Sequence, residues 1–86
     1  MRSLKATQVT PSEMGFIVDV REAEDFHHGH VPGSMNLPMG QLRRGAEDLK
    51  RLPRVILACQ EGKRAVQAAE ILESQGLTNV EVLEGG

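Results

Sequence analysis

The feature that most constrains the fold is a short apolar run that is followed, after a few polar residues, by apolar residues at helical spacing. The run Val55-Ile56-Leu57-Ala58 has the length and composition of a buried β-strand. Between Arg64 and Ser74, apolar residues recur as they do on one face of a helix. The inner face of this helix is predicted to consist of Ala65, Ala68, Ala69 and Leu72. A buried strand that leads directly into such a helix predicts a βαβ unit.

Three further segments have strand patterns, and helical patterns lie between them. Residues 16–20 are apolar on both faces, which indicates a central strand, while residues 34–37 and 80–83 form shorter candidates. We therefore predict an α/β fold, with a small parallel β-sheet flanked by helices on both faces. The length of 86 residues allows one domain, covering residues 1–86.

The remaining elements are predicted from local signals. Gln8-Val9 is a candidate short edge strand. Residues 10–13, Thr-Pro-Ser-Glu, have the capping-box pattern of a brief helix start. Residues 23–27 suit one helical turn, and residues 39–52 are predicted to be helical in part. Gly76 suits the position just past the end of a helix.

The composition excludes several classes of function. A net charge of −2 argues against general nucleic-acid binding, which needs a basic surface. The chain has no apolar run of membrane-spanning length and no signal-peptide core after its first five residues. Its single cysteine cannot form an internal disulfide, and it has no Cys-x-x-Cys pair for zinc. These features indicate a soluble protein of a reducing compartment, which we expect to be the cytoplasm.

The only cysteine lies in the loop between the apolar run and the helix, which reads Cys59-Gln60-Glu61-Gly62-Lys63-Arg64. Backbone N–H groups and the positive end of the helix dipole face such a position and stabilise a thiolate, the reactive form of cysteine. The alternative is a buried cysteine that acts only as a small hydrophobe. The glycine and the two basic residues of the loop favour a nucleophile.

Other polar residues also follow predicted strands. Asp19, Arg21 and Asn36 fall at or just after strand ends, as Cys59 does. In open parallel sheets the ligand site lies off the carboxyl ends of the strands, so we expect these residues at one edge. Asp19 and Arg21 could serve as acid–base groups, but an ion pair that holds a loop is the favoured interpretation.

Several stretches together resemble the rhodanese-like domain family. The first are residues 17–22, Asp25-Phe26, residues 29–34 and Asn36-Leu37-Pro38, which resemble its N-terminal signature. Residues 59–64 resemble its active-site loop, and residues 83–86 resemble a motif near its C-terminus. The resemblance extends over nearly everything from Phe16 onward, and the motifs occur in the family's order.

This resemblance implies a sulfurtransferase. Cys59 would take a sulfane sulfur from a donor such as thiosulfate, become a persulfide, and pass the sulfur to a thiol, protein or cyanide acceptor. Gln60, Glu61, Gly62, Lys63 and Arg64 would bind the substrate, all through their backbone N–H groups and the last two also by charge. Asp19, Arg21 and His30 would support the site. No metal or organic cofactor is implied.

The family usually continues into a further helix beyond the position of Gly86. We therefore expect one face of the sheet to be less well covered. Glu61 is also unusual within the loop, where it would partly offset the charge of Lys63. It is expected to disfavour doubly charged donors.

Other functions are possible for parts of the sequence. His27, His28 and His30 could bind a metal ion, but no second ligand group stands at a recognised spacing. Phosphatases of the same fold use a longer loop between cysteine and arginine. Ubiquitin-like sulfur carriers end in Gly-Gly, as this sequence does, but lack strand–helix alternation. The alternative left open is a non-catalytic, regulatory or docking module of a larger protein.

Overall fold

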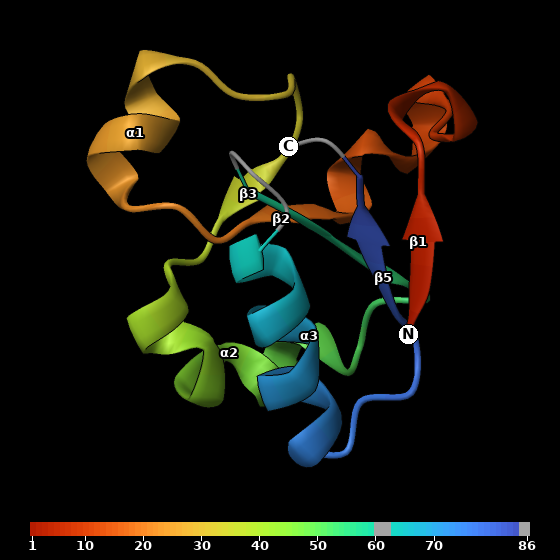
Figure 1. The fold of residues 1–86 in the computed structure, drawn as a ribbon, viewed down its shortest axis with the longest axis vertical. Helices are drawn as coiled ribbons and strands as arrows, with labels where there is room; N and C mark the ends of the chain where they lie inside the picture. Colours follow the sequence, from red (N-terminus) through yellow and green to blue (C-terminus); the bar gives the residue numbers. More distant parts are fainter. Residues whose placement is uncertain (60–62, 85–86) are drawn as a thin grey trace.

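A parallel β-sheet lies at the centre of the molecule (Figure 1). The computed structural model describes residues 1–59 and 63–84. Within these residues the strands are β1 (Arg2–Leu4), β2 (Ile17–Asp19), β3 (Met35–Asn36), β4 (Val55–Ala58) and β5 (Val80–Leu83). They form a five-stranded sheet in the order β1-β5-β4-β2-β3, and every neighbouring pair is parallel. The predicted parallel α/β fold is confirmed.

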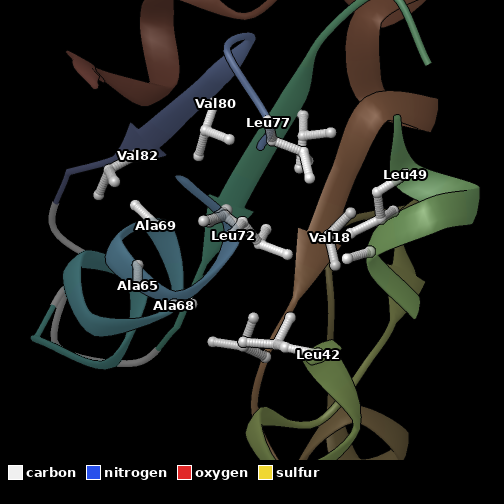
Figure 2. Close-up of a cluster of buried hydrophobic side chains, with 14 of the residues drawn as sticks. Val18, Leu42, Leu49, Ala65, Ala68, Ala69, Leu72, Leu77, Val80 and Val82 are labelled. Carbon is white, nitrogen blue, oxygen red and sulfur yellow. The ribbon is translucent and has the colours of Figure 1, made fainter. Parts of the chain in front are cut away.

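Two α-helices cover one face of this sheet. The α-helices of the described residues are α1 (Ala23–His28), α2 (Leu42–Leu49) and α3 (Lys63–Ser74). The two that cover this face are α2 and α3. Side chains from α2 and α3 pack in one core with the central strands (Figure 2). The predicted inner face of α3 is confirmed, since all four of its residues are buried. Three of them are alanines, whose small side chains let the helix approach the sheet closely.

The opposite face is covered by tight 3₁₀ helices and a loop. These helices are η1 (Ala6–Gln8) and η2 (Pro11–Phe16), while η3 (Met39–Gln41) precedes α2. Here the buried core is small. An apolar cavity of about 120 Å³ remains among Ala6, Val9, Met14, Ile17, Val31 and Leu83. Coverage of the two faces is therefore unequal.

The N-terminal segment differs from its prediction. The edge strand is Arg2–Leu4, which pairs with β5, whereas Gln8 belongs to η1. The reason is local, because the Gln8 side chain accepts a hydrogen bond of 2.8 Å from the backbone N–H of Lys5 and closes a turn. The predicted start at residue 10 is confirmed. The Glu13 carboxylate accepts hydrogen bonds from the backbone N–H and the hydroxyl of Thr10, although the helix that follows is 3₁₀.

The end of α3 is fixed by a glycine. Gly76 has a φ of +98°, which favours a residue without a Cβ. Its N–H donates to the carbonyl of Glu73, and the N–H of Leu77 donates to that of Leu72 at 3.1 Å. This pair of bonds is the Schellman motif, so the predicted role of Gly76 is confirmed.

No helix in the described part of the chain combines the length and the apolar character needed to cross a membrane.

Candidate functional site

The polar residues predicted at strand ends meet at the carboxyl edge of the sheet. Asp19, the last residue of β2, pairs with Asn36 of β3 on one side and with Ala58 of β4 on the other. Cys59 directly follows Ala58, and the N–H of Val20 donates to the Ala58 carbonyl at 3.0 Å. The strand register therefore brings β2, β3 and the start of the cysteine loop together at one edge.

Cys59 lies at the junction of β4 and α3. Its side chain is buried, with 4% of its surface exposed. The backbone N–H of Ala65, in the first turn of α3, donates to the Cys59 sulfur over 3.3 Å. The sulfur is thus held at the positive end of the helix dipole, where backbone donors can stabilise negative charge.

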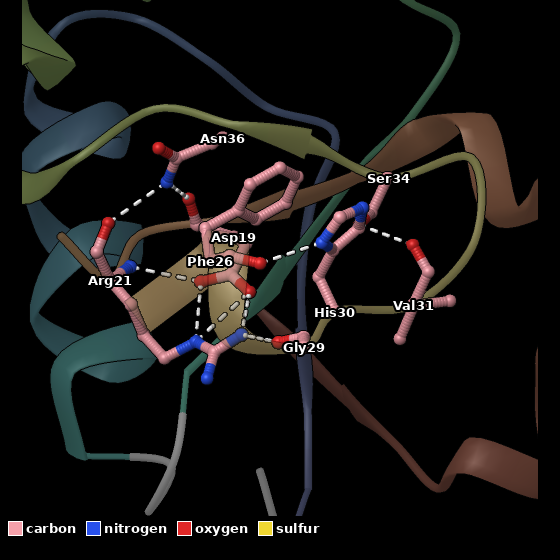
Figure 3. Close-up of polar contacts among 8 residues, drawn as sticks. All are labelled: Asp19, Arg21, Phe26, Gly29, His30, Val31, Ser34 and Asn36. Atoms are coloured by element: carbon pink, nitrogen blue, oxygen red, sulfur yellow. Dashed lines mark hydrogen bonds and ion pairs between the residues drawn. The ribbon is translucent and has the colours of Figure 1, made fainter. Parts of the chain in front are cut away.

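Asp19 and Arg21 form an ion pair beside this junction (Figure 3). The Arg21 Nε lies 3.0 and 3.1 Å from the two carboxylate oxygens, and Nη2 lies 2.8 Å from Oδ2. The Arg21 backbone N–H also donates to this carboxylate, at 2.9 Å. Nη2 further donates to the carbonyl of Gly29 at 2.6 Å, which ties the pair to the loop after α1.

The groups around Arg21 stabilise its positive charge. Its hydrogen bonds to Asp19 raise the pKa of the guanidinium above its ordinary value, although burial opposes this shift. The negative charge of Asp25 acts in the same direction as Asp19. Arg21 therefore stays positively charged in its ion pair with Asp19.

His30 and Asn36 form further hydrogen bonds beside this ion pair (Figure 3). The His30 Nδ1 lies 2.7 Å from the carbonyl oxygen of Phe26, so this nitrogen must carry the proton. The imidazole stacks on the Phe26 ring at 3.7 Å. The Asn36 amide donates to the carbonyls of Asp19 and Arg21. The acceptors on Phe26 and Gly29 are backbone atoms, which no sequence motif marks.

The histidines do not assemble into a metal site in the structure. His27 and His28 are exposed on α1, whereas the Nδ1 of His30 bonds a carbonyl. Across residues 1–59 and 63–84, no group of three or more histidine, cysteine or acidic residues could hold a metal ion.

The predicted substrate-binding loop is described in part. Gln60, Glu61 and Gly62 lie outside the described residues, so their predicted roles stay predictions. Lys63 and Arg64 form the exposed first turn of α3. The structure thus places two positive residues in the first turn of the helix whose Ala65 backbone N–H contacts the buried sulfur.

Comparison with known proteins supports the assignment that the motifs suggested. Residues 2–86 match the model of the rhodanese-like domain. The chain belongs to the rhodanese-like family.

Known proteins resemble this chain in sequence and in fold. The thiosulfate sulfurtransferase GlpE of Shewanella oneidensis is 33% identical over 81 residues, which cover 92% of this chain and 78% of GlpE. The structure of a rhodanese-related protein from Thermoplasma volcanium superposes with a TM-score of 0.84 at 31% identity. That match covers all of this chain and 86% of the other. The relatives thus include a sulfurtransferase, and this chain shares its fold with the Thermoplasma protein.

Two other relatives are considerably longer than this chain. YqhL of Bacillus subtilis is 36% identical over 70 residues, which are 81% of this chain but 56% of YqhL. YrkF of the same organism is 33% identical over 64 residues, 74% of this chain and 35% of YrkF. The chain therefore spans a third to about half of these two relatives.

Proposed function

We propose that this chain is a sulfurtransferase that carries a sulfane sulfur as a persulfide on Cys59. The observation that carries the proposal is the hydrogen bond of 3.3 Å from the Ala65 N–H to the Cys59 sulfur, at the positive end of α3. Membership of the rhodanese-like family supports sulfur transfer in general. Thiosulfate is the proposed donor, because the relative GlpE is named a thiosulfate sulfurtransferase.

The proposed reaction has two displacements. The Cys59 thiolate attacks the outer sulfur of thiosulfate, the sulfur–sulfur bond of the donor breaks, and sulfite leaves with the electron pair. Cys59 then carries a persulfide anion. A thiolate or cyanide attacks the outer sulfur, takes it as a persulfide or thiocyanate, and releases the Cys59 thiolate. This is a double displacement through a covalent intermediate.

The surrounding residues have distinct proposed roles. Backbone N–H groups between Gln60 and Arg64 surround the added sulfur, and the side chains of Lys63 and Arg64 attract the anionic donor. The ion pair of Asp19 with Arg21 holds the adjacent loop, and His30 fixes that loop to the end of α1. Because the thiolate must stay reduced between cycles, a reducing compartment such as the cytoplasm suits this chemistry.

Mass spectrometry of the intact protein tests the proposal. After incubation with thiosulfate, we expect a gain of one sulfur atom that peptide mapping places on Cys59 and that cyanide removes. A second donor, such as a small organic persulfide, separates the choice of donor from the chemistry. No gain from either donor on a folded chain would contradict the proposal and would favour a non-catalytic docking module.

Replacing Arg64 by alanine is expected to slow persulfide formation from thiosulfate by roughly 10- to 100-fold. A hydrogen bond to a charged partner contributes about 1.5–3 kcal/mol, and this exposed side chain has a charge of the sign that thiosulfate needs. Quenched time courses of sulfite release would measure this effect, and thermal unfolding would show whether the variant keeps its fold.

The matched control is Arg51→Ala, which removes another exposed arginine, in the turn after α2 and away from the site. Its rate is expected to equal that of the wild type. If Arg64→Ala also kept the wild-type rate, Arg64 would have no part in binding the donor.

A further inference from the structure

Four exposed basic residues occupy the first turns of two helices that begin at the carboxyl edge of the sheet, where Cys59 lies. Arg43 and Arg44 belong to the first turn of α2, and Lys63 and Arg64 to the first turn of α3. We call these four residues the basic rim. Among residues 1–59 and 63–84, none of the four has a carboxylate within salt-bridge distance. Three other basic residues do have such partners, namely Arg21, Lys50 and Arg54.

The chain topology places both first turns at the carboxyl edge of the sheet. The N–H of Leu37 donates to the Asp19 carbonyl at 2.9 Å, and that of Met39 donates to the Val20 carbonyl at 3.2 Å. These bonds hold the start of η3, and with it the start of α2, against the end of β2. The start of α3 is held at the same edge by the bond from Ala65 to Cys59. Figure 1 shows both helices leading away from this edge.

The positive charges of the basic rim do not stabilise the helices to which they belong. Positive charge near a helix N-terminus opposes the helix dipole, and the first turns of α2 and α3 contain no acidic residue. The chain as a whole has a net charge of −2, so the rim is a local concentration rather than part of a general excess. Solvent-exposed, unpaired charge of one sign is suited to attracting a partner of the opposite sign.

We propose that the basic rim docks an acidic protein whose cysteine exchanges sulfur with Cys59. The inference rests on the proposed function and adds the class of partner. In the transfer step, the partner thiolate attacks the outer sulfur of the Cys59 persulfide. The bond between the two sulfurs on Cys59 breaks, the partner becomes the persulfide, and Cys59 leaves as a thiolate.

A protein fits this edge better than RNA does. Glu22, Glu24 and Asp25 lie at the start of α1, just after the carboxyl end of β2, and Glu24 and Asp25 are in its first turn. A polyanion that crossed the whole edge would meet these carboxylates. A protein can instead place a limited acidic patch over α2 and α3 and leave the α1 side free.

Sulfur transfer to two peptides tests the docking surface. Each peptide has one central cysteine, flanked by glutamates in the first and by glutamines in the second. The variant Arg43→Glu with Arg44→Glu reverses half of the rim and leaves the cysteine loop intact. The matched control is Arg2→Glu with Arg51→Glu, the same charge change at exposed positions beside the opposite edge.

At low ionic strength, we expect the rim variant to transfer sulfur to the glutamate peptide about 10-fold more slowly than the wild type. The control variant is expected to keep the wild-type rate, and added salt is expected to remove the difference. All three proteins are expected to transfer sulfur to the glutamine peptide at the same rate. Since flanking glutamates also alter the reactivity of the peptide thiol, each rate is compared among proteins for one peptide.

Binding measurements separate this inference from the proposed function. Fluorescence anisotropy with a glutamate peptide that has serine in place of cysteine reports docking even if no persulfide forms. Weaker binding by the rim variant than by the control supports docking. Equal binding by both would overturn it, as would an oligouridine that binds the rim while the peptide does not. Arg43→Gln with Arg44→Gln serves as a second variant if the glutamate variant fails to fold.

Discussion

Replacing Cys59 by serine is expected to abolish sulfur transfer, with a loss of at least about 10³-fold in the rate of thiocyanate formation. The serine hydroxyl is a poor nucleophile near neutral pH and cannot form a persulfide, so both displacements fail. Colorimetric assay of thiocyanate would measure the rate, and mass spectrometry would show whether any sulfur is bound.

The same substitution is expected to leave the fold intact. Serine is slightly smaller than cysteine, and its oxygen can accept the hydrogen bond that Ala65 now donates to sulfur. We expect the free energy of unfolding to change by about 1 kcal/mol or less. Because the chain contains a single cysteine, sulfur transfer retained by Cys59→Ser would show that another group carries the sulfur.

The most strongly patterned elements were predicted well. The strand at Val55–Ala58 was placed without error, and the predicted helix begins one residue late but ends at the observed Ser74. Both carry an apolar pattern that burial in the core reinforces, so local preference and tertiary packing agree. The gathering of Asp19, Asn36 and Cys59 at one edge followed from the parallel topology alone.

The elements that the sequence did not specify are short and depend on tertiary contacts. β1 has three residues, of which only Leu4 is buried, so it has no alternation to detect. β3 has two residues and was predicted two residues too long. The sequence indicated which side chains support the site, but not the backbone atoms that accept their hydrogen bonds. Its acceptors on Phe26 and Gly29 are carbonyl groups, which every residue possesses.

Replacing Asp19 by alanine is expected to lower the free energy of unfolding by about 3–5 kcal/mol. The Asp19 side chain is 7% exposed, and its carboxylate accepts the hydrogen bonds of the Arg21 guanidinium and backbone N–H. Removing it leaves the half-buried positive charge of Arg21 without its carboxylate partner, which costs more than the net stability that the pair provided. Urea unfolding, followed by circular dichroism, would measure the change.

The size of this effect depends on burial rather than on the presence of an ion pair. Glu47→Ala removes the exposed partner of Lys50 and is expected to change stability by less than about 0.5 kcal/mol, since the Glu47 side chain is 81% exposed. The free energy of unfolding of a domain of this length is on the order of 5–10 kcal/mol, so Asp19→Ala comes close to unfolding it. If Asp19→Ala instead kept the wild-type urea midpoint and lost sulfur transfer, Asp19 would act in the reaction itself and not as support for the site.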